Sequence, residues 1–313
     1  MPDDVTQDIT DEISKKDRTW LLPSHNKNQI KPGLYIVPTP IGNMGDITIR
    51  ALDVLQDADL IMCEDTRVTG KLLNYFDIKH KDLIVYNDHS DGDIRDMAIK
   101  SIHEGACVAL VSDAGAPMIS DPGYKLLRAC IDADVFITAL PGANAPLPAL
   151  QLSGLPTDCF IFAGYVPNKE KARADHIKRW AEADVPVICY ETAPRLIKTL
   201  AAISELLGDR QIAVVREISK LYESARRGKA GKLIAHYQEF GPPKGEIVLI
   251  IGPSDDQLTD EEIEARLRAA LKTRRTKEAA AEVAKNTGRS KSELYDLALV
   301  IAKDDKDDDN AEE

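Results

Sequence analysis

The sequence lacks the features that would place the protein in or across a membrane. No apolar run approaches the roughly 18 residues that a membrane-spanning helix needs, and the N-terminus is polar and acidic, unlike an export signal. The five cysteines form no CxxC pair, and most of them lie in apolar runs where a buried thiol is expected. These absences predict a reducing, cytoplasmic environment and no membrane partner.

Motifs that would identify a common cofactor are also missing. The chain contains no GxxxxGK(S/T) phosphate loop, no GxGxxG fingerprint after its first predicted strand and no GxSxG nucleophile turn. Its six scattered histidines form no HxxxH or HExxH pair, so no metal site is expected. The residues alone predict a mononucleotide-like or similarly polar ligand in a cleft between domains.

Negative charge is concentrated at the two ends of the chain. Of the formal net charge of −12, residues 1–20 and 304–313 carry −9, because they hold thirteen acidic residues against four basic ones. Residues 266–291, by contrast, hold nine Lys and Arg against two Glu. The acidic balance therefore does not exclude an RNA partner, although such a basic region is equally typical of an ordinary solvated helical face.

Short β-branched runs alternate with amphipathic stretches, which predicts parallel strands covered by helices on both faces. We therefore expect an α/β protein with two αβα domains, whose sheets are mainly parallel or mixed, followed by a small C-terminal helical appendage. The predicted strands lie at 34–37, 60–63, 83–86, 108–111 and 135–140 in the first domain, and at 160–166, 186–191, 211–217 and 246–252 in the second.

The domain boundaries are predicted from breaks in this pattern. Gly and Pro interrupt it at GLPTD (154–158), and after GPSDD (252–256) only helical periodicity continues. Composition predicts that both ends are disordered. The predicted parts are an acidic tail at 1–30, α/β domains at 31–153 and 154–254, a basic helical appendage at 258–303 and a disordered acidic tail at 304–313.

Unusual residues gather in the loops that follow four of the predicted strands. Because ligands bind beyond the carboxyl ends of the strands in open α/β sheets, one cleft is expected to gather these loops. Gly and Pro permit a close approach of a ligand to the backbone, and Asp accepts hydrogen bonds from hydroxyl or amino groups. The alternative is that these are turn and capping residues, and Asp121 is expected to be the N-cap of the next helix. The loops are PTPIGNMGD (38–46), EDTR (64–67), SDAGAPMISDPG (112–123) and PGANAP (141–146).

These loops lie within longer stretches that are characteristic in themselves, namely LYIVPTPIGNMGDITIRALDVLQDADLIMCEDTR (34–67), VALVSDAGAPMISDPGYKLL (108–127), LPGANAPLPALQLSGLPTDCFIFAGYVP (140–167), REISKLYES (216–224) and KGEIVLIIG (244–252). Over residues 33 to 253 the chain closely resembles the tetrapyrrole methylase superfamily, and within it the branch that acts on ribosomal RNA. The resemblance implies two αβα domains that bind S-adenosylmethionine between them, usually in a homodimer. It also implies 2′-O-methylation of the ribose of a decoding-centre cytidine in 16S ribosomal RNA of the small ribosomal subunit.

The resemblance also implies which residues bind the cofactor. They come from the first, third and fourth loops and from the second domain. They are Thr39, Pro40 and Gly42, then Asp113, Ala114, Gly115 and Ile119, then Pro141, Gly142, Ala143 and Asn144, and finally Tyr190 and Gly245.

The chain departs from the family pattern at a few positions. The family motif YESPHR is YETAPR here (190–195), so that Pro194 stands where the family has a histidine. Ala116 stands where the family often has Thr, and Asn144 and Pro146 replace small residues. The chain is therefore expected to lack both the contribution of that histidine and one hydroxyl contact with the cofactor.

Methyl transfer to an alcohol requires near-attack positioning and a group that takes up the hydroxyl proton. Glu64 and Asp65, at the end of a predicted strand, are the candidates for that group, and Arg67 is near enough to bind a phosphate or to lower a carboxylate pKa. The alternative is that EDTR only caps the next helix and forms a local salt bridge.

Contacts with RNA phosphates are predicted for basic residues of the second domain and the appendage as well as for Arg67. Two other functions remain open: a corrinoid or porphyrinogen C-methyltransferase of the same superfamily, and a non-catalytic nucleotide-binding ribosome assembly factor. The additional predicted RNA-binding residues are Arg226, Arg227, Lys229, Arg274, Arg275, Lys277, Arg289 and Lys291.

Overall fold

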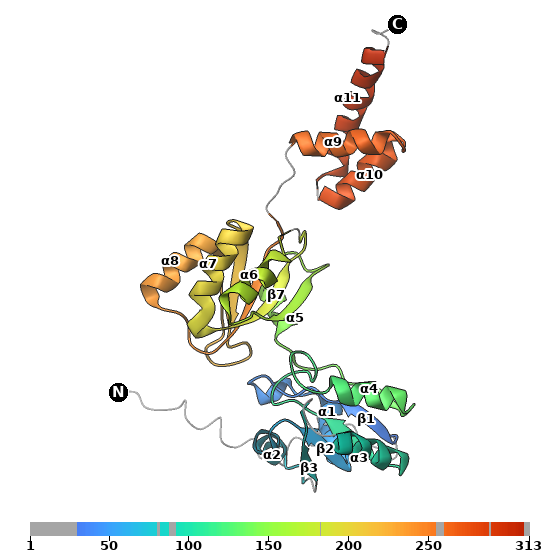
Figure 1. Ribbon diagram of the computed structural model, residues 1–313, viewed down its shortest axis with the longest axis vertical. Helices are drawn as coiled ribbons and strands as arrows, with labels where there is room; N and C mark the ends of the chain where they lie inside the picture. Colours follow the sequence, from blue (N-terminus) through green and yellow to red (C-terminus); the bar gives the residue numbers. More distant parts are fainter. Residues whose placement is uncertain are drawn as a thin grey trace, which may run out of the picture.

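The computed structural model describes residues 30–79, 82–87, 92–181, 183–254, 260–287 and 289–309. Two α/β parts and a helical part follow one another in chain order along the long axis of the molecule (Figure 1). The predicted acidic tail at 1–30 lies outside the described residues, except for residue 30.

The first sheet is entirely parallel, with strand order β3-β2-β4-β1-β5. Every residue of β1, β2 and β4 is buried, as expected for strands covered on both faces. Each strand overlaps one of the five predicted runs. The strands are β1 (Gly33–Ile36), β2 (Leu60–Cys63), β3 (Leu83–Val85), β4 (Cys107–Leu110) and β5 (Ile137–Ala139).

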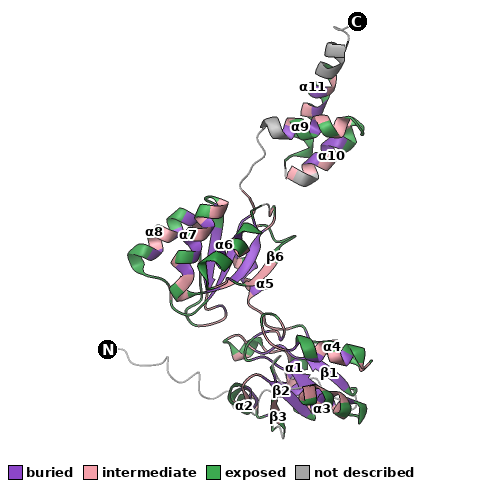
Figure 2. Cartoon of the chain, viewed as in Figure 1, coloured by how far each residue is buried: buried purple, intermediate pink, exposed green. Residues whose placement is uncertain are grey.

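Helices cover both faces of this sheet, because successive strand residues point to opposite sides. Tyr35 and Ile61 belong to the core that contains the buried residues of α1 and α2. Leu34 and Met62 belong to the opposite core, with α3 and α4. Buried residues accordingly lie along the strands and the inner helix faces (Figure 2). The helices are α1 (Ile49–Asp57), α2 (Thr66–Tyr75), α3 (Gly92–His103) and α4 (Tyr124–Asp132).

The second sheet is mixed, with strand order β6-β7-β10-β8-β9. β6 and β7 pair in parallel, whereas the other neighbours are antiparallel. The strand β9 was not predicted, because its sequence SARRGK has no β-branched residue and most of its side chains are exposed at the sheet edge. The strands are β6 (Ile161–Tyr165), β7 (Val187–Thr192), β8 (Gln211–Arg216), β9 (Ser224–Lys229) and β10 (Glu246–Ile251).

Three helices cover one face of the second sheet, and α5 (Pro146–Ser153) covers the other. α6 (Glu170–Lys178), α7 (Leu196–Leu207) and α8 (Ala230–Phe240) contribute to one core, whereas Ala149 and Leu150 of α5 pack with strands of the second sheet. The predicted domain boundary at 153/154 is therefore wrong. Gly154, with φ 73°, ends α5 as a left-handed C-cap, and the chain crosses between the domains before this helix.

The C-terminal part is helical, as its periodicity predicts. Ile263, Leu267, Val283, Leu294 and Ile301 form its core across three helices, which are α9 (Asp260–Leu271), α10 (Thr276–Thr287) and α11 (Lys291–Asp309). The prediction of disorder from residue 304 is wrong as far as Asp309, because extending an anchored helix costs much less free energy than nucleating one. Among the described residues, no helix combines the length and apolar character of a membrane span.

Candidate active site

The four loops that follow strands of the first sheet meet at its carboxyl edge, as predicted. Thr39 and Gly115 exchange two backbone hydrogen bonds of 2.9 Å, which join the first loop to the third. The amide of Asp65 donates a 3.1 Å hydrogen bond to Oδ1 of Asp113, which joins the second loop to the third. Asn144 and Ala145 of the fourth loop line the same cavity as the third loop.

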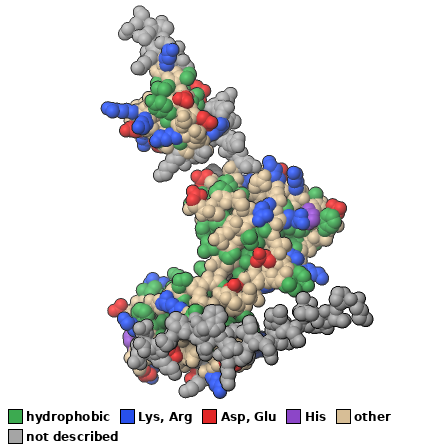
Figure 3. All heavy atoms as spheres, turned by 180° about the vertical axis from the view of Figure 1, so that it is seen from behind, with side chains coloured by type: hydrophobic (Ala, Val, Ile, Leu, Met, Phe, Trp, Pro, Cys, Tyr) green, Lys and Arg blue, Asp and Glu red, His purple; other side chains and the backbone are tan. Residues whose placement is uncertain are grey.

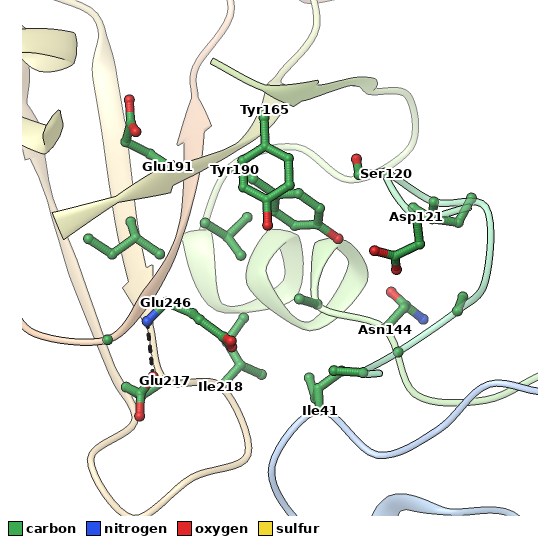
Figure 4. Close-up of a pocket in the computed structure, with 18 of the residues that line it drawn as sticks. Ile41, Ser120, Asp121, Asn144, Tyr165, Tyr190, Glu191, Glu217, Ile218 and Glu246 are labelled. Atoms are coloured by element: carbon green, nitrogen blue, oxygen red, sulfur yellow. Dashed lines mark hydrogen bonds between the residues drawn. The ribbon is translucent and has the colours of Figure 1, made fainter. Parts of the chain in front are cut away.

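A cavity of about 280 Å³ lies where these loops face the second domain. Figure 4 shows side chains from both domains pointing into it. Among the described residues that line it, five are acidic and none is Lys or Arg. Glu191 is fully buried and pairs with Arg195. Lys220 pairs with both Glu217 and Glu246. The excess negative charge therefore lies on the first-domain side of the lining, and it favours a cationic ligand over an anionic one. The acidic residues are Asp113, Asp121, Glu191, Glu217 and Glu246.

More than half of the predicted cofactor-binding residues line this cavity, namely Asp113, Ala114, Gly115, Ile119, Asn144, Tyr190 and Gly245. Two smaller sets line neighbouring hollows: Thr39, Pro40 and Gly42 in one, Gly142 and Ala143 in the other. In the described part of the chain, Pro141 lines none of these three. The structure thus brings the third loop and the second-domain residues together at the cavity. Thr39, Pro40 and Gly42 of the first loop line a neighbouring hollow instead.

The third loop has an unusual backbone. Met118 (φ 69°) and Ser120 (φ 72°) adopt the left-handed region without being glycine, and such conformations persist only where the surroundings enforce them. The loop thereby carries Asp121 into the cavity lining. Helix α4 begins later, after Gly123, which provides no side-chain cap. The prediction that Asp121 caps α4 is therefore wrong.

The carboxylate of Asp121 lies in a strongly acidic environment. Burial, followed by the neighbouring carboxylates of Glu64 and Asp113, raises its pKa from 3.8 to about 7. In Figure 4 this carboxylate and the hydroxyls of Tyr165 and Tyr190 point into the same space. Burial raises the pKa of both tyrosines, and the charge of Asp121 adds to the effect.

The two acidic residues of the second loop have different environments. Asp65 is the N-cap of α2: its Oδ1 accepts the Arg67 amide at 2.8 Å, and its Oδ2 lies 2.5 Å from Nη2 of Arg67. The hydrogen bonds from Arg67 lower the pKa of Asp65 to about 2. Glu64 has one buried oxygen without a hydrogen-bond partner in the described structure, and burial followed by the charge of Asp113 raises its pKa. Neither residue lines the cavity. Asp65 instead caps α2 and forms a local salt bridge, which is the alternative role considered for EDTR.

Gly245 allows Glu217 to pack closely at the second-domain wall. With φ 97° at Gly245, an added Cβ would lie 2.3 Å from Oε1 of Glu217. That oxygen accepts the Glu246 amide at 3.0 Å and Nζ of Lys220 at 3.1 Å, and these contacts lower the pKa of Glu217. Nζ of Lys220 also donates to Oε2 of Glu246 at 2.9 Å. Any side chain at residue 245 would disturb this arrangement.

Glu191 of the YETAPR motif is fully buried and saturated with hydrogen bonds. Its Oε1 accepts the Thr192 amide and pairs with Arg195, both at 2.6 Å, and its Oε2 accepts the Thr199 hydroxyl at 2.5 Å. Pro194 takes no part in these contacts and is exposed. The motif therefore keeps a structural role that does not need the family histidine.

The second domain supplies cavity residues that sequence reasoning missed. Tyr165, Glu217 and Glu246 line the cavity beside the predicted Tyr190 and Gly245. Glu217 lies within REISKLYES (216–224) and Glu246 within KGEIVLIIG (244–252), and Tyr165 lies within the characteristic stretch 140–167. The stretches were found, but nothing in them distinguished cavity-lining residues from their neighbours.

The structure places the predicted RNA-binding residues in separate groups. Arg67 is 85% exposed and pairs with Asp65. β9 carries a second, exposed group, in which Nε of Arg227 donates to the Leu152 carbonyl at 2.8 Å. Arg274 forms an ion pair with Glu282. Figure 3 shows basic side chains on both the second domain and the helical part. The β9 group is Arg226, Arg227 and Lys229, and the helical group is Arg274, Arg275, Lys277, Arg289 and Lys291.

Comparison with protein families agrees with this architecture. A model described as Tetrapyrrole (Corrin/Porphyrin) Methylases matches residues 33–234, and the chain belongs to this family. A second model, described as the RsmI C-terminal HTH domain, matches residues 257–302.

Named relatives indicate the group of proteins within this family to which the chain is similar. The chain is 51% identical over 278 residues to the ribosomal RNA small subunit methyltransferase I of Erythrobacter litoralis, a match that covers 88% of this chain and 98% of that protein. It is 42% identical over 270 residues to the protein of the same name from Escherichia coli O157:H7, covering 85% and 94% respectively. These matches group the chain with ribosomal RNA small subunit methyltransferase I proteins.

Solved structures confirm the predicted fold. A diphthine synthase superimposes with a TM-score of 0.55 at 16% identity, over 70% of this chain and 89% of that one. The cobalamin biosynthetic cobalt precorrin-4 methyltransferase superimposes with a TM-score of 0.50 at 19% identity, over 70% and 94%. At this level of identity the likeness concerns the fold alone.

Proposed function

We propose that this protein is an S-adenosylmethionine-dependent methyltransferase that methylates the ribose 2′-hydroxyl of a decoding-centre cytidine in 16S ribosomal RNA. The observation that carries the proposal is the acid-lined cavity between the two α/β domains of a tetrapyrrole methylase. Relatives that match over nearly their full length are named ribosomal RNA small subunit methyltransferase I. This favours RNA over a corrinoid or porphyrinogen as the substrate.

The residues around the cavity fit S-adenosylmethionine, whose sulfonium and amino groups are cationic. Asp113 faces the cavity from the first domain, and Glu217 and Glu246 from the second. Gly115, at φ 79°, has no side chain to fill the space between the loops. When bound, S-adenosylmethionine supplies an electrophilic methyl group.

The predicted cofactor residues have distinct tasks in this proposal. The third loop, with Asp113, Ala114 and Gly115, binds the cofactor along its backbone, and Asn144 and Tyr190 close the pocket. Oδ1 of Asn144 already accepts the Leu147 amide at 3.1 Å, so its amide group is held in place. Thr39 acts indirectly, because its backbone hydrogen bonds with Gly115 fix the loop. Such fixed positions favour near-attack geometry.

The acidic cavity also constrains how RNA binds. The excess negative charge of the cavity repels phosphates, so in this proposal the ribose enters while the phosphates stay outside. The exposed Lys and Arg side chains of β9 and of the helical part supply positive charge away from the cavity. We propose that both groups contact phosphates of the small ribosomal subunit, and that the protein acts as a cytoplasmic homodimer.

The test uses small ribosomal subunits from cells that lack this methylation. They are incubated with the purified protein and methyl-labelled S-adenosylmethionine, and the RNA is digested to nucleosides for mass spectrometry. Label in 2′-O-methylcytidine from the decoding centre supports the proposal. Label only on an added tetrapyrrole indicates the C-methyltransferase, and cofactor binding without transfer indicates a non-catalytic assembly factor. Naked 16S RNA in parallel shows whether the assembled subunit is needed, and sedimentation shows whether the protein is a dimer.

A further inference from the structure

We propose that Asp121 accepts the proton of the ribose 2′-hydroxyl during methyl transfer, and that neither Glu64 nor Asp65 does so. The inference rests on the proposed function and identifies a catalytic residue within it. It is based on the position of Asp121 in the cavity, which neither Glu64 nor Asp65 lines, on the hydrogen bonds of the other carboxylates and on the charges around it.

The other acidic residues of the cavity are already engaged. Glu191 accepts two hydrogen bonds and forms an ion pair with Arg195. Glu217 accepts from the Glu246 amide and Lys220, and the Glu246 carboxylate accepts from Lys220. Asp113 accepts the Asp65 amide. A general base needs a free lone pair within reach of the proton that it takes up. Glu191 is held at both oxygens. The contacts of the other three fix their carboxylates in place, and each of them keeps one oxygen without a partner among the described residues.

Asp121 differs from them. Within the described part of the chain, no hydrogen bond or ion pair engages its carboxylate, which points into the cavity (Figure 4). The second domain reaches it through β6, where a Cβ on Gly164 would lie 3.6 Å from Oγ of Ser120. This close approach brings Tyr165 beside Asp121. The acceptor position is thus formed by both domains.

The charges around Asp121 suit a base that works near neutral pH. Glu64 and Asp113 surround it from the first domain, Tyr165 and Tyr190 face it from the second, and burial contributes most to the rise of its pKa to about 7. A base is most effective when its pKa lies near the working pH. Asp65, with its pKa lowered to about 2 by Arg67, is a far weaker proton acceptor.

The step balances in atoms and charge. The ribose oxygen forms a bond to the methyl carbon while the carbon–sulfur bond breaks and its electron pair remains on sulfur. The hydroxyl proton passes to a carboxylate oxygen of Asp121, and its bonding electrons remain on the ribose oxygen. Water then removes the proton from Asp121 and restores the carboxylate.

The test compares Asp121→Asn with the wild-type protein and with Asp158→Asn, a matched change at an exposed aspartate between α5 and β6. Single-turnover methylation of undermethylated small subunits is measured from pH 5.5 to 9, and S-adenosylmethionine affinity is measured by calorimetry. We expect the wild-type rate to rise with pH to a plateau, with an inflection near pH 7. Asp121→Asn should lower the plateau by about 10² to 10⁴-fold and abolish the inflection, with the cofactor Kd changed less than about threefold.

Two results would overturn the inference: a rate of Asp121→Asn comparable to wild type, or a weakened cofactor Kd with a normal rate at saturation, which would make Asp121 a cofactor ligand. Asp121→Glu, which keeps the carboxylate, should recover part of the rate and the inflection; failure to do so also counts against the inference. If the wild type itself methylates no ribose, the proposed function fails and the inference fails with it. If wild type and Asp121→Asn methylate equally, only the inference fails.

Discussion

Replacing Asp121 with Asn should stabilise the protein at alkaline pH, because the folded structure disfavours the negative charge that Asp121 carries there. The pKa of Asp121 is raised from 3.8 to about 7 by burial and by the carboxylates of Glu64 and Asp113. A raised pKa means that the stabilisation from the protonated form is fully present below about pH 3.8 and is lost as the pH rises through 7. Asn stays neutral throughout, so the variant gains on the wild type above pH 7 and matches it below pH 4.

The size of the gain follows from the pKa change. A rise from 3.8 to about 7 corresponds to about 4 kcal/mol at 1.36 kcal/mol per pH unit. Because Asp121 is only partly buried, solvent screening reduces this to about 1–2 kcal/mol. At roughly 2–4 °C per kcal/mol for domains of this size, the melting temperature at pH 8 should rise by about 2–8 °C.

Differential scanning calorimetry at pH 4 and pH 8 measures this effect, with Asp158→Asn as the matched control. The expected result is a higher Tm for Asp121→Asn at pH 8 and little difference at pH 4. An equal difference at both pH values would refute the electrostatic reasoning, and so would a lower Tm of the variant at pH 8. Agreement would show that this carboxylate costs stability where it is proposed to act.

Three other predictions test the remaining parts of the site. Thr199→Val should destabilise the second domain by about 1.5–3 kcal/mol, because it removes a hydrogen bond to the buried charge of Glu191. Urea denaturation measures this loss of stability, and an unchanged midpoint would contradict the prediction. Gly245→Ala should weaken S-adenosylmethionine binding at least about tenfold by calorimetry, because the new Cβ displaces Glu217, whereas affinity for small subunits should persist. Joint replacement of Arg274 and Arg275 by Glu should weaken binding to small subunits and reduce its salt dependence; unchanged affinity in a filter-binding assay would exclude these residues from the interface.

The convergence of the four loops could be predicted from sequence because parallel strands end at one edge of their sheet. The sequence runs that form β1, β2 and β4 are continuous and apolar, which predicts buried strands of a parallel sheet. The edge strand β9 could not be found, because its exposed basic side chains carry no apolar signal. The packing partner of α5 was also hidden, since an apolar helix does not specify which of two sheets it covers.

The misassignment of Asp121 has a different cause. Asp followed by Pro and Gly before a helical pattern is typical of a helix start, and local sequence favours that reading. The position of Asp121 is set instead by the left-handed backbone at Met118 and Ser120 and by the approach of Gly164 from the other domain. These are tertiary constraints, and they carry no local sequence signal. The loop could be identified from sequence, but the direction of its side chains could not.

The acidic lining of the cavity has a consequence for enzymatic turnover. Methyl transfer converts a sulfonium into a neutral thioether, so the spent cofactor carries one positive charge fewer than the fresh one. In the proposed binding mode, the acidic lining around Asp113 attracts it correspondingly less. The side chains that collect the methyl donor therefore also favour exchange of the used cofactor for a new one, and high salt should narrow the difference between their affinities.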